Sequence, residues 1–186
     1  TRDRRQRQMC IRDRYYKTST GNHLQVGVQA TDGSKLYHIR GSDGERWDNG
    51  SSSSGTSTRY SNTSVIGVAL DLDNGKWYVA ANNTYQDAGN GSGNPTAGSG
   101  QVHSGLSGEF QFFTGNATSG GGQTYVANFG QDSSFAGNKT AQGNADGNGI
   151  GDFYYTPPSG FLALCTSNLP CLLYTSDAAD DLVGVD

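Results

Sequence analysis

The chain has 186 residues and a net charge of −4, which allows one domain of ordinary size. Only 33% of the residues are hydrophobic and 16% are charged, whereas 28 are glycine, so a core must come from short apolar segments joined by long polar connections. Affinity for nucleic acids depends on neutralising phosphates with Lys and Arg, and the negative net charge argues against it. No apolar run reaches the ~20 residues that cross a bilayer, so no membrane span is expected.

The two ends of the chain differ from the sequence between them. Residues Arg4–Arg14, RRQRQMCIRDR, hold five of the thirteen basic residues, and they match one translated frame of a transposase-type sequencing adapter. The reverse complement of that adapter, translated in another frame, matches Cys171–Asp180. We therefore expect residues 1–14 and 171–186 to be adapter-derived, not biological, and to add nothing to the fold. Residues 15–170 are then a metagenomic fragment of a larger multidomain chain.

The sequence between these ends predicts short β-strands. Apolar and polar residues alternate in residues 23–30 and 34–40, as in strands with one buried face. The clearest signal is Val65–Leu72, followed by Asp73-Asn74-Gly75, for which we predict a type I′ hairpin turn, and by a return strand from Trp77. Other strands are expected near residues 108–115 and 123–130, and polar loops over 41–57, 82–100 and 131–151. This pattern predicts an all-β protein, an antiparallel β-sandwich.

Three motifs carry a resemblance to a known family. In chain order they are VIGVALDLDNGKWYV, TYVANFGQ and FYYTPPSGFLALCTSNLP, and they resemble the SPRY (B30.2-like) domain, closest to the branch found in phage and environmental viral proteins. The resemblance implies a bent antiparallel sandwich of the concanavalin-like type over residues 15–170, N-terminally truncated. It also implies that residues 66–71 form a central strand, that Asn128–Gly130 end another, and that Pro157–Phe161 folds back to close the core.

Catalytic constellations are not evident in the sequence. Asp71 and Asp73 lie two residues apart, but the second occupies a turn where Asp is common, and Glu109 is distant in sequence. The three histidines, His23, His38 and His103, are expected to be solvated or at strand edges. The sequence therefore predicts a protein that is not an enzyme.

The segment NADGNGIGD is a weak candidate for a calcium loop. Asn144, Asp146, Asn148 and Asp152 place oxygen donors at the spacing of such a loop, but Tyr155 stands where a bidentate Glu is expected. A Gly/Asn-rich surface loop gives the same pattern. No cofactor is expected, with calcium as the alternative.

A ligand-binding role is predicted for three residues of the 41–60 region. Arg46, Trp47 and Tyr60 are of the types that dominate binding hot spots, although Trp47 could instead pack beneath its own loop. The leading hypothesis is a non-catalytic recognition module of a larger phage or viral structural or tail-associated protein, virion-borne or extracellular. It would bind a protein or a glycan through surface loops. The alternatives are a glycan-active enzyme on a concanavalin-like sandwich and a structural spacer without a ligand.

Overall fold

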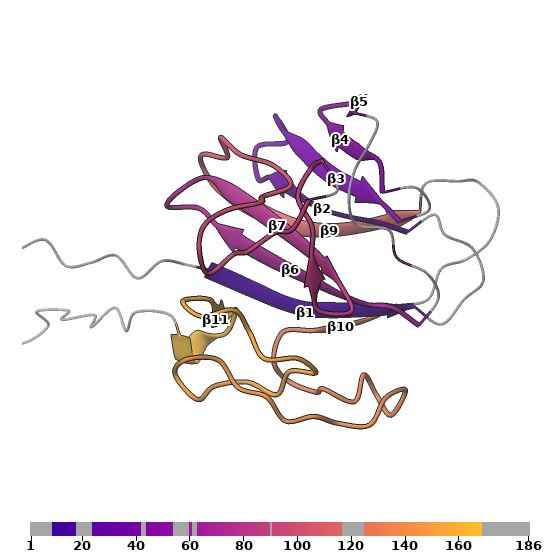
Figure 1. Ribbon diagram of the computed structural model, residues 1–186, viewed down its shortest axis with the longest axis vertical. Helices are drawn as coiled ribbons and strands as arrows, with labels where there is room; N and C mark the ends of the chain where they lie inside the picture. Colours follow the sequence, from indigo (N-terminus) through magenta and orange to yellow (C-terminus); the bar gives the residue numbers. More distant parts are fainter. Residues whose placement is uncertain are drawn as a thin grey trace, which may run out of the picture.

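Two β-sheets packed face to face form the protein (Figure 1). The computed structural model describes residues 9–17, 24–41, 44–53, 60, 63–89, 91–116 and 125–168. Apart from one parallel pair, β1 with β11, the strands pair in the antiparallel sense. The predicted antiparallel β-sandwich is therefore confirmed. In the described ranges no helix has the length and apolar character to cross a membrane.

The strands divide between a six-stranded and a five-stranded sheet. The first has the order β10-β1-β6-β7-β8, with β11 also paired to β1, and the second has the order β5-β4-β3-β2-β9. The bounds are β1 Met9–Lys17, β2 Leu24–Ala30, β3 Leu36–Arg40, β4 Arg46–Asp48, β5 Ser51–Ser53, β6 Val65–Asp71, β7 Lys76–Ala81, β8 Thr84–Tyr85, β9 Phe110–Asn116, β10 Tyr125–Asn128 and β11 Leu162–Ala163. A single 3-10 turn, η1 Thr166–Asn168, follows β11.

The main core fills the space between the two sheets. Alternate residues of each strand point into this space, because successive side chains of a strand lie on opposite faces. The cluster contains these buried side chains: Val26, Val28, Tyr37 and Ile39 from the five-stranded sheet, and Ile66, Val68, Leu70, Trp77 and Val79 from the six-stranded sheet. The apolar residues that alternate in the sequence are thus the ones on the inner face of each strand.

A second core lies on the outer face of the six-stranded sheet. Ala69 and Tyr78 pack there against Phe153, Phe161 and Ala163, which belong to the segment after β10. In Figure 1 this segment, orange to yellow, runs beneath β1 and β6 on the side away from the other sheet. Because both faces are covered, all seven residues of β6 are buried. The expected central strand and the return of Pro157–Phe161 onto the core are both present.

Strand β1 occupies a segment that was expected to lie outside the fold. Residues 9–13 pair with Asp71–Gly67 of β6, and residues 10–11 also pair with β11 on the other edge. Sheet pairing joins backbone groups, so an extended segment of almost any sequence can occupy such a position. The expectation that residues 1–14 add nothing to the fold is therefore wrong for residues 9–14, while their adapter origin stays a prediction.

The hairpin turns also differ from the prediction. In the β6–β7 connection only Gly75, with φ of 61°, has positive φ, so the turn is not type I′. Type I′ geometry, with positive φ at both central residues, instead occurs at Asn82-Asn83 (48° and 68°) between β7 and β8. It occurs again at Asn49-Gly50 (47° and 84°) between β4 and β5, inside a region expected to be a loop.

Deletion of residues 1–14 is expected to lower the free energy of unfolding by about 3 kcal/mol or more. The deletion leaves one edge of β6 unpaired, and each lost backbone hydrogen bond contributes about 0.5–1.5 kcal/mol. Urea denaturation of the full and shortened chains measures the difference. As a control, residues 9–13 replaced by alternating Thr and Val should retain most of the stability, and a shortened chain as stable as the full one would contradict the pairing.

Gly75→Ala is expected to lower the free energy of unfolding by about 2–4 kcal/mol. A Cβ at this position would lie 2.5 Å from the backbone oxygen of Leu106, in addition to the strain of positive φ. Gly137→Ala is the matched control, because Gly137 has a φ of 83° but open space around its Cβ position, so only about 1 kcal/mol is expected. Equal losses in the two variants, measured by denaturation, would show that the contact with Leu106 relaxes without cost.

Candidate ligand-binding face

The outer face of the five-stranded sheet carries a row of aromatic side chains. The strand register places Phe113 of β9 opposite Gly27 of β2, Gly27 opposite His38 of β3, and His38 opposite Trp47 of β4. These four residues, the aromatic row, therefore run across four neighbouring strands. Their sequence neighbours point the other way, into the main core, so one set of strands supplies both the core and this face.

Gly27 allows the row to be continuous. A Cβ at this position would lie 2.5 Å from the ring of Phe113 and 2.7 Å from Cβ of His38, so the Phe113 ring covers the bare backbone of β2. Glycine inside a strand is typical of such close approach. The Phe113 and His38 rings are 5.8 Å apart in an edge-to-face arrangement, which is a favourable geometry for an aromatic pair.

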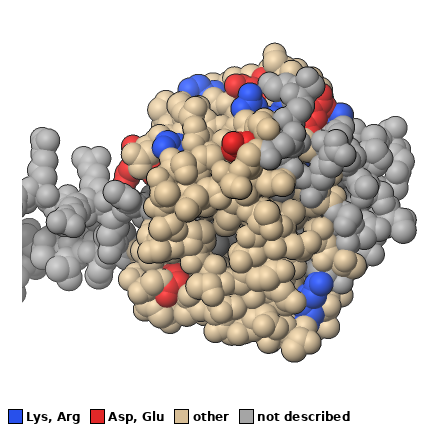
Figure 2. All heavy atoms as spheres, in the orientation of Figure 1, with Lys and Arg blue, Asp and Glu red and all other residues tan. Residues whose placement is uncertain are grey.

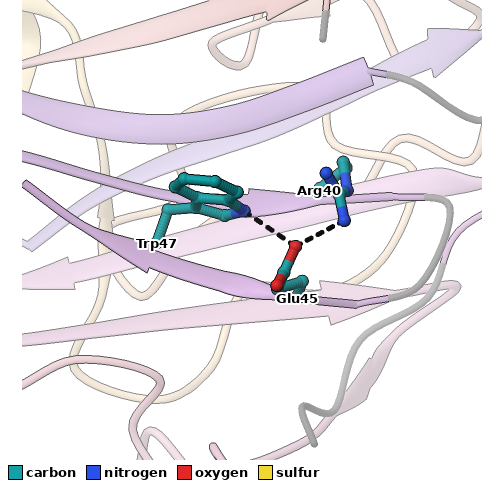
Figure 3. A network of polar contacts seen from close by, with 3 residues as sticks. All are labelled: Arg40, Glu45 and Trp47. Atoms are coloured by element: carbon teal, nitrogen blue, oxygen red, sulfur yellow. Dashed lines mark hydrogen bonds and ion pairs between the residues drawn. The ribbon is translucent and has the colours of Figure 1, made fainter. Parts of the chain in front are cut away.

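Trp47 forms the other end of the row and is held in a fixed orientation. Its indole stacks nearly parallel to the His38 ring, with centroids 5.7 Å apart and planes 7° apart. Figure 3 shows the carboxylate of Glu45 between two donors: Trp47 Nε1 donates to Glu45 Oε2 at 3.1 Å, and Arg40 forms an ion pair with the same oxygen. The guanidinium of Arg40 also lies 5.8 Å from the centre of the indole, within cation–π range. The half-buried indole is thus fixed by three neighbours.

Polar but mostly uncharged side chains flank the aromatic row. On one side, Gln29 and Gln111 are opposite each other, and the Gln111 amide donates to the Gln29 amide oxygen at 3.4 Å. On the other side, Gln25 is opposite both Arg40 and Gly115. Figure 2, in the orientation of Figure 1, views the layers from the side and shows charged side chains mainly in the upper part, near β3, β4 and β5. The row therefore has amide groups on both sides and one neutralising ion pair.

The structure separates the three residues predicted to bind a ligand together. Arg46 follows the alternation of β4 and points to the opposite side from Trp47, where its Nη1 donates to the backbone oxygen of Val102 at 3.0 Å. Tyr60 is 3% exposed, belongs to the main core, and donates its hydroxyl to the backbone oxygen of Ile39 at 2.9 Å. Trp47 alone remains on an accessible face, and that face is a sheet and not a loop.

Asp146, one of the four calcium candidates, forms hydrogen bonds with backbone N–H groups through both carboxylate oxygens. Asp146 Oδ1 accepts the backbone N–H groups of Asn148 and Ile150, at 2.9 and 3.0 Å. Its Oδ2 accepts the backbone N–H of Ala163 at 2.8 Å and the side-chain amide of Asn168 at 2.7 Å. These four hydrogen bonds make Asp146 a structural acceptor that joins the 146–150 turn to Ala163 and Asn168.

Two other calcium candidates, Asn144 and Asn148, also form hydrogen bonds within the chain. Asn144 donates its amide to the backbone oxygens of Phe153 and Tyr154, and Asn148 donates to the side chain of Asn168. Asp152 Oδ1 is buried without a hydrogen-bond partner in the described part of the chain. No group of three or more His, Cys, Asp or Glu side chains in the described ranges is arranged to hold a metal.

Asp71, considered from the sequence as a catalytic group, stabilises the connection between β6 and β7. It is 3% exposed and accepts the backbone and side-chain N–H groups of Asn74, at 3.1 and 2.7 Å, which holds the β6–β7 connection. Asp73 lies in that connection and is exposed. The two carboxylates thus have different surroundings and do not form a pair on one strand face.

A separate apolar cleft of about 690 Å³ opens beside β9, between the two sheets. Leucine and phenylalanine side chains line most of it, and Glu109 and Thr31 lie at its polar side. Two of its walls, Phe110 and Phe112, also pack against the main core. The cleft is therefore an extension of the core edge, whereas the aromatic row has polar groups on both sides that can orient a ligand.

Two histidines that were expected to be solvated or at strand edges are buried. His38 is 6% exposed and His103 is 5% exposed, and His103 stacks on Trp77 with ring centroids 5.3 Å apart. Burial lowers the pKa of His38 to about 4, assisted by Arg40 and opposed by Glu45. Burial likewise lowers the pKa of His103 to about 3, assisted by Arg46 and His38. His23 lies outside the described residues.

The free energy of unfolding is expected to fall as the pH decreases from 7 to 5. An unfolded histidine takes up a proton near pH 6.5, whereas His38 and His103 stay neutral in the folded state, so acid favours unfolding. Two such groups give a slope approaching about 2.7 kcal/mol per pH unit below pH 6. Urea denaturation at several pH values measures the slope, which should halve in His103→Asn. A free energy independent of pH in this window would contradict the burial.

Comparison with known proteins adds no relative: the sequence matches no protein-family model, and no curated protein matches it.

Proposed function

We propose that this domain is a non-catalytic recognition module that binds its ligand on the outer face of the five-stranded sheet. The observation that carries the proposal is the aromatic row, with Trp47 held in one orientation by Glu45, His38 and Arg40. Rigid aromatic side chains bury a large area at low entropic cost, and fixing them before binding reduces the cost further. The surface thus has the properties of a preformed binding site.

Three carboxylates in different parts of the domain have structural partners. Glu45 pairs with Arg40 and Trp47, while Asp71 and Asp146 accept backbone N–H groups. A general acid or base must reach the atom whose proton it transfers, and these oxygens are already engaged. This arrangement supports recognition over hydrolysis as the function.

We also propose that the module belongs to a larger phage or viral structural or tail-associated protein, in a virion or extracellular setting. This part of the proposal is supported by the resemblance of three ordered motifs to SPRY domains. The fold alone does not select a ligand, because one sandwich architecture can carry many binding functions. Both a protein and a glycan are therefore tested as ligands.

Trp47→Ala is expected to weaken ligand binding at least tenfold, about 1.4 kcal/mol, without unfolding the domain. The purified chain is applied to an array of glycans and to an array of cell-surface ectodomains, and each hit is quantified by calorimetry. Tyr125→Ala is the matched control, since Tyr125 is an aromatic residue 39% exposed on the other sheet. Absence of binding on both arrays, or equal binding by wild type and Trp47→Ala with an intact melting transition, would overturn the proposal.

A further inference from the structure

We infer that the ligand of the aromatic row is a neutral oligosaccharide that lies across the strands, over Phe113 and Trp47. This inference rests on the proposed recognition function and specifies its ligand class. Four properties of the face lead to it: its charge, the pairing of aromatic with amide groups, its length, and the presentation of side chains on the face of the sheet.

The charge of the face argues against an ionic ligand. Arg40 and Glu45 form an ion pair. The other residues that the strand register places beside the row on this face are uncharged: Gln25, Gln29, Leu36, Ser52, Gln111 and Gly115. Binding of nucleic acids or other polyanions depends on Lys and Arg that are available to the ligand. A ligand without net charge therefore forgoes no ion pair when it binds to this surface.

The combination of flat aromatic rings with flanking amides matches the chemistry of a sugar ring. One face of a pyranose presents C–H groups, which pack against an aromatic ring, while its hydroxyl groups project sideways as donors and acceptors. Gln25, Gln29 and Gln111 lie beside the row and offer both an amide donor and a carbonyl acceptor. An aliphatic ligand would leave these amides without partners, which costs binding energy.

The length and direction of the row indicate a short oligosaccharide. The row crosses β9, β2, β3 and β4, so its ends are separated by about 14 Å, or three strand spacings. The Phe113 and Trp47 rings are each within 6 Å of the His38 ring, so the apolar floor has no gap. A chain of about three sugar rings would cover this distance.

The geometry is less suited to a protein partner. A stable protein interface covers about 800 Å² on each side around an apolar centre, whereas the apolar floor here is a single row of rings bordered by amides. Addition of a peptide strand uses the backbone groups of an edge strand such as β9, whereas the row offers side chains on the face of the sheet. Of the two ligand classes, the glycan is therefore the one this surface favours.

Glu45 is a positioning residue in this proposal, because it acts on the ligand through Trp47. Glu45→Gln keeps an oxygen that can accept from Trp47 Nε1, whereas Glu45→Ala removes it. Affinity should therefore be retained within about threefold in Glu45→Gln and fall at least tenfold in Glu45→Ala. An equal loss in both variants would instead assign Glu45 a purely structural part.

The experiment is calorimetry of the full chain with soluble neutral hexose and N-acetylhexosamine oligomers of one to six units. Affinity is expected to rise with length up to about three units and then level off, and to fall at least tenfold in Trp47→Ala and Phe113→Ala. Tyr125→Ala should bind like the wild type. Since Trp77 is fully buried, protection of tryptophan fluorescence from acrylamide by the sugar reports on Trp47, and it should disappear in Trp47→Ala.

Three outcomes would contradict the inference, and they differ in whether the proposed recognition face is also contradicted. Binding of a protein ectodomain that Trp47→Ala abolishes, with no sugar bound, keeps the recognition face but excludes the glycan. A preference for sulfated or uronic-acid oligomers excludes the neutral class. Sugar binding that is unchanged in both Trp47→Ala and Phe113→Ala, with melting curves showing folded variants, places the ligand elsewhere and removes the proposed face as well.

Discussion

Burial of β6 on both faces is the constraint on which the rest of the structure depends. Its inner residues meet the five-stranded sheet, and its outer residues, such as Ala69, meet the segment after β10. A strand covered on both sides is expected to be almost entirely apolar, and Val65–Leu70 of β6 has no polar side chain, while the buried Asp71 at its end is hydrogen-bonded to Asn74. Because the six-stranded sheet is covered twice, the five-stranded sheet is left with the face that water and ligands can reach.

The segment that covers the six-stranded sheet has almost no regular structure, so its backbone groups need other partners. The Asp146 carboxylate accepts four hydrogen bonds, which connect Asn148, Ile150, Ala163 and Asn168. Asn128, at the end of β10, accepts three successive backbone N–H groups and donates to the backbone of Asp152. Buried side-chain oxygens thus replace the ladder of a sheet. Side chains such as Asp146 supply oxygen acceptors at regular intervals because the backbone N–H groups of this segment need partners. This need accounts for the spacing that resembles a calcium loop.

The strands could be predicted from the sequence where the signal is local, and the proposed binding face could not. The alternation around Val65–Leu72 is sufficient to locate β6, whereas the three strand residues Arg46–Asp48 are too few to show an alternating pattern before the turn. Asn49-Gly50 was a usable signal, since it is the dipeptide that favours type I′ turns. The similar Asn74-Gly75 gave the wrong turn type, because the Asp71 carboxylate holds Asn74 outside the left-handed region.

The aromatic row could not be read from the sequence because its members come from four strands and meet only through register. Phe113 is far in sequence from Gly27, and nothing local to either residue indicates that one ring covers the other. His38 shows what the arrangement costs: it is buried beneath this face, and in the described part of the chain neither ring nitrogen has a hydrogen-bond partner. Burying unpaired polar atoms is unfavourable, and an aliphatic residue would avoid it. Sequences often depart from the most stable local choice at functional sites, so the unpaired ring of His38 that supports the indole of Trp47 is consistent with the proposed binding face.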